Sequence, residues 1–164
     1  MKNKSEPLHL KVDVELPYRW AAGHYGSIFL KTLRDKAVIT GNRCPVCRKV
    51  YVPPRVVCGP CFVAPDELVE LPPTGTLAGY SVVNYPFIDP ETGIKRPVPY
   101  TYGYIKLDGC DSYLSHFIDE VNPERLSTGI RVKAVFETAS ERQGRMQDIR
   151  YFQIIDSDSA GGKK

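Results

Sequence analysis

The sequence contains no long hydrophobic run, because no stretch of its 164 residues approaches the ~20 apolar residues that a membrane-spanning helix requires. The first residues, MKNKSEPLHLKVDVELP, have neither an apolar core nor a small-residue cleavage site, so they do not resemble a secretory signal. Hydrophobic residues make up 42% of the chain and charged residues 25%, which argues against a wholly disordered protein. We therefore expect a globular cytoplasmic protein with no membrane partner.

Familiar catalytic motifs are also missing. The sequence has no glycine-rich phosphate loop, no G-x-S-x-G elbow and no H-E-x-x-H pair. Its histidines, His9, His24 and His116, are scattered, and no base can be identified beside the lone thiol of Cys110. We expect no catalytic residue and no autonomous catalysis, and a hydrolase that uses Cys110 is the weakest alternative.

Acidic residues are absent from one continuous segment, which runs from Lys36 to Pro65. The basic residues of this segment are Lys36, Arg43, Arg48, Lys49 and Arg55. The net charge of the whole chain is only +3, which is too small to indicate nucleic-acid binding by itself. Two interpretations stay open: the local positive charge offsets a metal–thiolate site, or it forms a face that binds a phosphate ligand or an acidic partner.

Four of the five cysteines form a C-x2-C-x10-C-x2-C array, made by Cys44, Cys47, Cys58 and Cys61. Each pair encloses turn-forming residues, and two such turns aim four thiolates at one point, as tetrahedral zinc requires. An odd number of cysteines without a secretory signal argues against a disulfide framework. We expect one structural zinc per chain. The alternatives are an iron centre on the same thiolates and a redox dithiol, which would need only one pair.

Changes in the pattern along the chain divide it into four parts. Residues 1–36 are predicted to form an arm and a helical segment in two pieces, and residues 37–71 a zinc ribbon. Two prolines and a glycine then mark a boundary. Residues 72–156 are predicted to form a second domain, and residues 157–164 a disordered tail.

The second domain contains five segments with the pattern of β-strands. They are residues 76–85, 100–107, 111–118, 130–137 and 147–155. Asp108-Gly109 predicts a tight hairpin turn, and Asn122 with Pro123 predicts one helical turn before the fourth strand. Five strands with such a link match an OB-fold. The predicted fold is mostly β with a short helical N-terminus, a rubredoxin-like zinc ribbon and then a five-stranded OB-fold barrel.

Two features of the second domain suggest a ligand or a partner. The loop over residues 86–99, PFIDPETGIKRPVP, is long for a strand connection, and long loops are often functional, although its four prolines also fit a rigid connector. Tyr100, Tyr102 and Tyr104 share one face of a strand and are spaced to stack a flat ring. Such a stripe is more often barrel core or interface.

The order of these parts resembles a known family. The stretches RCPVC, YVPPRVVCGPC, PPTGTLAGYSVV, PYTYGYIKLDG and LSTGIRVKAVFE are similar to the zinc-ribbon and OB-fold family of acyl-CoA-associated proteins. The resemblance covers residues 18–155, and the PPR between the cysteine pairs is seldom found in other zinc ribbons. One departure is Arg48, because the family usually has glycine there.

This resemblance implies a function. Members of the family are usually non-catalytic partners of thiolases or related condensing enzymes, and they help to bind or channel the CoA thioester. The resemblance thus implies a hetero-oligomer with a thiolase-fold subunit, which carries the nucleophilic cysteine and the histidine. One branch serves the thiolase of anaerobic toluene degradation, which cleaves benzoylsuccinyl-CoA, and the aromatic, proline-rich loop makes this branch attractive.

We predict that the basic and aromatic positions of the ribbon and of the long loop contact CoA or the partner. These positions are Arg43, Arg48, Arg55, Phe87, Lys95, Arg96 and Tyr100. The alternative function is a module that binds single-stranded nucleic acid, since zinc ribbons and OB-folds both commonly do so. The small net charge makes nucleic acid an unlikely partner.

Overall fold

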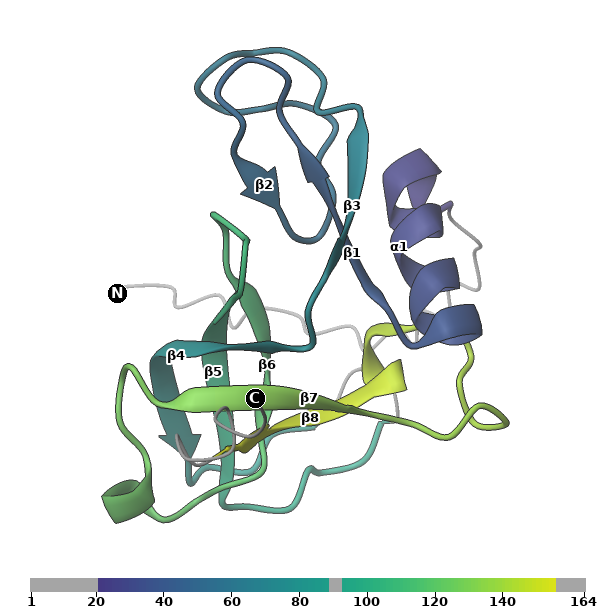
Figure 1. The fold of residues 1–164 in the computed structure, drawn as a ribbon. Coiled ribbons are helices and arrows are strands. Elements are labelled where there is room, and N and C mark those ends of the chain that lie inside the picture. Colours follow the sequence, from purple (N-terminus) through teal and green to yellow (C-terminus); the bar gives the residue numbers. More distant parts are fainter. Residues whose placement is uncertain (1–20, 89–92, 156–164) are drawn as a thin grey trace, which may run out of the picture.

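The computed structural model describes residues 21–88 and 93–155. Within these residues it has one α-helix, a three-stranded sheet and a closed barrel of five strands. Figure 1 shows the small sheet above the barrel, with the helix beside both. The predicted fold class is confirmed. The arm and the disordered tail proposed for the two ends lie outside the described residues, apart from the last positions of the arm segment.

The helix α1 spans Gly23–Lys36 and is continuous, rather than divided into the two pieces that the sequence suggested. It ends where Ala37 adopts a left-handed conformation, with φ of 53°, and donates its N–H to the carbonyl of Leu33. Phe29 and Leu33 lie on one face and are buried. This apolar face packs the helix against the first sheet and the barrel.

The first sheet contains β1 (Ile39–Arg43), β2 (Val50–Tyr51) and β3 (Glu67–Leu71), in the order β2-β1-β3. All its pairs are antiparallel, and Arg43 lies opposite Glu67. The strand β3 was not predicted from the sequence. Three of its five residues are exposed and only Leu71 is buried, so it has no clear alternation of buried positions.

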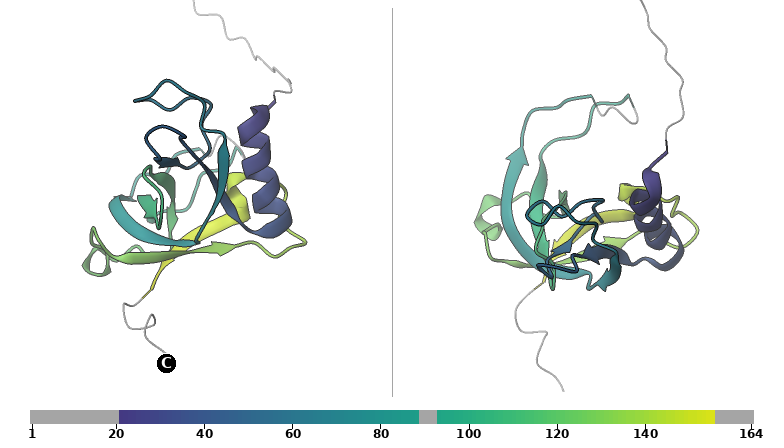
Figure 2. Two further views of the ribbon diagram at one scale, coloured as in Figure 1. Left: turned by 45° about the horizontal axis from the view of Figure 1, so that its top comes forward. Right: turned by 90° about the horizontal axis from the view of Figure 1, so that it is seen from above.

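The barrel contains β4 (Thr74–Val83), β5 (Tyr100–Leu107), β6 (Leu114–Ile118), β7 (Arg131–Phe136) and β8 (Ile149–Ile154). The order β4-β5-β6-β8-β7 closes on itself through pairing of β4 with β7, and β6 runs parallel to β8. The strand β4 is irregular between Leu77 and Gly79 and curves around the barrel, as Figure 2 shows.

Two short 3-10 helices, η1 (Pro123–Arg125) and η2 (Met146–Asp148), join barrel strands. The predicted helical turn is η1, and the side chain of Asn122 caps it by accepting the N–H of Glu124 at 3.0 Å. The strand order and the position of η1 are those of an OB-fold.

The sheet and the barrel contribute residues to one large apolar core, and hydrogen bonds of the backbone also join them. The predicted third barrel strand begins late, at Leu114, because the residues before it bond to β2 and its neighbour. The N–H of Val50 donates to Asp111 Oδ2 at 2.9 Å, and the N–H of Val52 donates to Ser112 Oγ at 2.7 Å. The division into parts at residues 36, 71 and 156 stays a prediction.

Within the described segments, no helix is both long and apolar enough to cross a bilayer.

Candidate metal centre and aromatic groove

The four paired cysteines come together at the outer end of the small sheet. The Sγ atoms of Cys44, Cys47, Cys58 and Cys61 all lie within 4.8 Å of one another. The Sγ atoms of Cys47 and Cys58 are 3.6 Å apart. Tetrahedral zinc with bonds of ~2.3 Å places its sulfur ligands ~3.8 Å apart, so this arrangement fits the metal.

The two cysteine turns repeat one backbone geometry. The N–H of Arg48 donates to the carbonyl of Cys44 at 3.0 Å, and the N–H of Phe62 donates to the carbonyl of Cys58 at 2.8 Å. Arg48 and Phe62 both adopt a left-handed backbone conformation, with φ of 61° and 55°. This conformation favours glycine, so both turns hold a side chain in a backbone region that L-residues seldom adopt.

Tyr51 contacts the cysteine cluster through its hydroxyl. Its hydroxyl lies 3.1 Å from Cys58 Sγ, and this hydrogen bond lowers the pKa of the Cys58 thiol to about 6 because it stabilises the thiolate. Burial raises the pKa of the Cys61 thiol to about 12. The guanidinium of Arg55 lies over the Tyr51 ring, 5.0 Å from its centroid.

The burial and the number of the thiolates determine what a metal bound here could do. Cys44 and Cys58 are completely buried, and four thiolates would fill the coordination sphere of zinc. Such a site has no position for water or substrate, so the metal would hold the two turns together rather than take part in a reaction. The assignment of the four cysteines as zinc ligands stays a prediction.

The predicted basic contacts of the ribbon already have partners. Glu67, just beyond the segment without acidic residues, pairs with Arg43 at 2.5 Å and with Arg48 at 3.2 Å. Arg55 lies against Tyr51 instead. The positive charge of this segment is therefore partly offset, which the local composition alone did not reveal.

The remaining predicted contacts lie on the barrel, where a groove with a volume of about 840 Å³ runs along the outer face of β5. The residues that line it are Gly79, Tyr80, Ser81, Val83, Phe87, Arg96, Tyr100, Tyr102, Tyr104, Ser115, His116, Phe117, Met146 and Gln147. The groove brings together three predicted residues, Phe87, Arg96 and Tyr100. Lys95 is exposed and does not line it; its backbone bridges to Ile88.

Aromatic rings and one arginine are packed together in this groove. The rings of Tyr100 and Tyr102 meet the ring of Phe117 edge to face, with centroids 5.8 and 5.1 Å apart. Phe87 lies against Tyr100 in the same way, at 6.2 Å. The guanidinium of Arg96 lies 4.3 Å from the centroid of the Phe117 ring.

The tyrosine stripe of β5 faces outward, so its interpretation as barrel core is wrong, and its interpretation as an interface stays a prediction. The inward face of the strand is made by Thr101, Gly103, Ile105 and Leu107, all buried. A side chain at Gly103 would come within 2.6 Å of Leu77, so the core itself requires glycine there. The alternation of the sequence identifies one face of this strand but does not say which face is inside.

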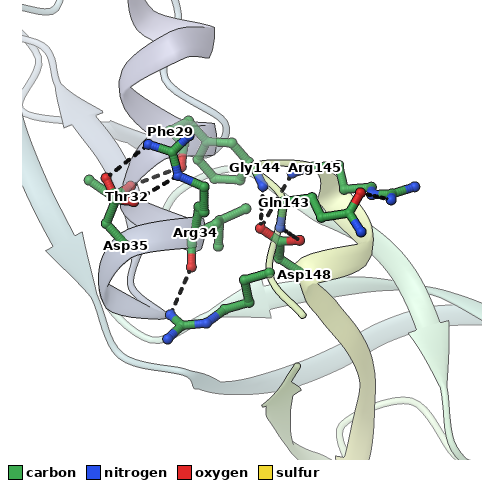
Figure 3. Close-up of polar contacts among 10 residues, drawn as sticks. Phe29, Thr32, Arg34, Asp35, Gln143, Gly144, Arg145 and Asp148 are labelled. Atoms are coloured by element: carbon green, nitrogen blue, oxygen red, sulfur yellow. Dashed lines mark hydrogen bonds and ion pairs between the residues drawn. The ribbon is translucent and has the colours of Figure 1, made fainter. Parts of the chain in front are cut away.

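His116 and the loop that follows β7 form one edge of the groove. His116 Nε2 lies 3.1 Å from the carbonyl oxygen of Met146, and burial lowers the pKa of the ring. The carboxylate of Asp148 accepts the N–H groups of Gln143 and Gly144 at 2.9 and 2.7 Å (Figure 3). These bonds fix the loop that carries Met146. No pattern in the sequence indicated this loop, because its role depends on backbone atoms.

Fold and site together define a class: a four-cysteine ribbon-like sheet joined to an OB-fold barrel. Residues 68–137 match the family model described as "ChsH2, C-terminal OB-fold domain". Two curated relatives are described as "DUF35 domain-containing scaffold protein". The chain is 29% identical over 110 residues to the one from Methanocaldococcus jannaschii, which covers 66% of this chain and 74% of that protein. It is 27% identical over 104 residues to the one from Methanothermobacter thermautotrophicus, and this alignment covers 63% of this chain and 74% of that protein.

Two solved structures share the fold. One, described as "Ltp2-ChsH2(DUF35) aldolase", has a TM-score of 0.60 and 20% identity, and the alignment covers 83% of this chain and 98% of that chain. The other is a protein of unknown function from the DUF35 family of Sulfolobus solfataricus, with a TM-score of 0.54 and 20% identity over 80% and 84% of the two chains.

Proposed function

We propose that this chain is an accessory, non-catalytic subunit of an acyl-CoA thiolase complex, which docks on the thiolase-fold subunit and helps to bind the CoA thioester. The observation that carries the proposal is the four-cysteine cluster rigidly joined to an OB-fold barrel. Similar proteins support it: one is described as a DUF35 domain-containing scaffold protein, and another as an Ltp2-ChsH2(DUF35) aldolase.

The ribbon is the docking platform in this proposal. The cysteine turns carry large apolar side chains that are exposed, namely Val46, Val56 and Phe62, with Phe62 84% exposed. In this proposal the partner covers these exposed apolar side chains. A structural zinc would keep the two turns that present them in a fixed arrangement.

The thioester lies between the chain and its partner. Arginine suits the phosphates of CoA because its planar guanidinium offers several N–H donors at once. Arg48 and Arg55 are exposed at the ribbon, where they would meet these phosphates. The loop at residues 86–99 would approach the acyl end. A substrate such as benzoylsuccinyl-CoA, which has an aromatic acyl group, is the specific candidate.

The chemistry is left to the partner, whose cysteine would be the nucleophile. In this chain the thiol of Cys110 is buried, and its hydrogen-bond partners in the described segments are the carbonyl of Val50 and the hydroxyl of Ser112. Neither can act as the base that a nucleophilic thiol requires. The purified chain alone should therefore show no thiolase turnover.

A pull-down tests the proposal. The tagged chain is recovered from its native host in mild salt, and its partners are identified by mass spectrometry. We expect a thiolase-fold protein in near-equal amount. Recovery of nucleic acid without a thiolase would overturn the proposal and favour the nucleic-acid alternative, as would thiolase turnover by the purified chain alone.

A further inference from the structure

The groove on the barrel has the size and the lining of a small-molecule site. Its volume of about 840 Å³ lies within the range of ~300–1,000 Å³ that is typical of ligand pockets. Such pockets are lined mainly by apolar and aromatic groups, with few polar ones. We propose that the groove binds a small planar aromatic anion, held by the tyrosine rings of β5 and by Arg96.

The rings are positioned before any ligand arrives. Tyr102 packs edge to face on Phe117, and it is still 41% exposed, while Tyr104 beside it is 60% exposed. Ordered rings with open faces can stack a planar ligand at little cost in side-chain entropy. A flexible aliphatic ligand would gain less, because it must itself be ordered and offers no ring to stack.

The groove contains a group that can bind an anion. None of the described residues that line it is acidic, and the one permanently charged lining side chain is Arg96. Its guanidinium lies over Phe117 and 5.7 Å from the centroid of the Tyr100 ring, so a positive charge is held against the aromatic surface. Arginine has five N–H donors, so it can bind a carboxylate while it keeps its other contacts.

His116 adds a buried polar atom to the lining. The residue is only 4% exposed, and its Nε2 bonds to Met146, which leaves Nδ1 as an acceptor. Nδ1 has no hydrogen-bond partner among the described residues. Buried polar atoms in proteins nearly always have a partner, so Nδ1 is expected to meet an ordered water, which can donate one hydrogen to Nδ1 and the other to the carboxylate of the ligand.

This proposal does not depend on the partnership with a thiolase, because it concerns the chain alone. The test is calorimetric titration of the full-length, metal-loaded chain with naphthoate, a planar anion of two fused rings. Octanoate serves as the aliphatic anion and naphthol as the uncharged ring. We expect naphthoate to bind one per chain and at least about tenfold more tightly than either control, as expected if stacking and charge each contribute.

Variants place the ligand in the groove. We expect Tyr102→Ala and Arg96→Gln to weaken naphthoate binding at least about tenfold. Tyr104→Ala should also weaken the binding. Tyr113→Ala is the matched control, since Tyr113 is exposed but lies outside the groove, and it should bind as the wild type does. No saturable binding at millimolar concentration, equal binding of octanoate, or equal losses in Tyr113→Ala and Tyr102→Ala would each overturn the proposal.

Discussion

The hydroxyl of Tyr51 lies 3.1 Å from Cys58 Sγ, and this contact joins the cysteine cluster to the rest of the chain. The residues on either side of Tyr51 bond to Asp111 and Ser112, which belong to the turn between β5 and β6. One short strand thus touches the candidate metal centre with its side chain and the barrel with its backbone.

Removing the Tyr51 hydroxyl should weaken metal binding. Tyr51→Phe keeps the ring but removes the hydroxyl that donates to Cys58 Sγ, and loss of such a partner typically lowers metal affinity ~10–100-fold. Competition with a colorimetric chelator measures the change. Tyr80→Phe, which removes a hydroxyl bonded to Leu126 on the barrel, is the control and should keep the wild-type affinity. Equal affinity in Tyr51→Phe and the wild type would contradict this role.

The backbone conformation of Arg48 predicts that a glycine variant is more stable than a valine variant at this position. Because its φ is 61°, Arg48→Gly should be tolerated or slightly stabilising, whereas Arg48→Val should cost roughly 1–2 kcal/mol. The lost pair with Glu67 matters little in either variant, since Arg48 is largely exposed. Thermal unfolding of the metal-loaded chains measures both. A valine variant as stable as the glycine variant would show that the turn is not strained.

Ser112 should couple the ribbon to the barrel. Its hydroxyl accepts the N–H of Val52 at 2.7 Å and donates to the carbonyl of the same residue at 3.0 Å, in a buried position. Ser112→Ala leaves both backbone groups without a partner, so we expect a loss of ~1–3 kcal/mol in urea unfolding. Ser81→Ala, at an exposed position, should change stability by less than about 0.5 kcal/mol. Similar losses in the two variants would contradict the coupling.

Acid should weaken the ion pair between Arg131 and Asp108 in the barrel. Arg131 binds both carboxylate oxygens of Asp108, at 2.7 and 2.6 Å, and this pairing lowers the pKa of Asp108 to about 2. A lowered folded-state pKa gives stability that is complete above the unfolded value, about 4, and is lost as the pH falls toward 2. Because both side chains are partly exposed, we expect only roughly 0.5–1 kcal/mol.

The pH dependence can be measured with one pair of variants. Asp108→Asn should be less stable than the wild type at neutral pH, and the difference should shrink between about pH 4 and pH 2. Asp66→Asn, at an exposed position, is the control and should not show this convergence. A difference that stays constant down to pH 2 would mean that the ion pair is not its source.

Local signals in the sequence predicted much of this structure. The cysteine spacing placed four thiolates together, and the cap at Asn122 lies where the sequence placed it. A turn forms at Asp108-Gly109, but residues 108–113, rather than two residues, connect β5 to β6. The strand β3 escaped prediction because pairing with β1, rather than its own pattern, creates it.

Contacts between distant residues were the part that the sequence could not supply. The bond from Tyr51 to Cys58, the pairing of Glu67 with two arginines and the carbonyl of Met146 beside His116 all depend on the folded chain. The outward direction of the β5 tyrosines could not be predicted either, because alternation defines two faces of a strand without saying which one the barrel encloses.

The most direct test of the central claim compares what two forms of the tagged chain retain from the native host. One is the wild type, and the other is the Cys44→Ser, Cys47→Ser variant, in which the ribbon has lost half of its thiolates. We predict that the wild type retains a thiolase-fold subunit in near-equal amount and that the variant, with its barrel still folded, loses it. A wild-type chain that retains no thiolase-fold protein would contradict the account.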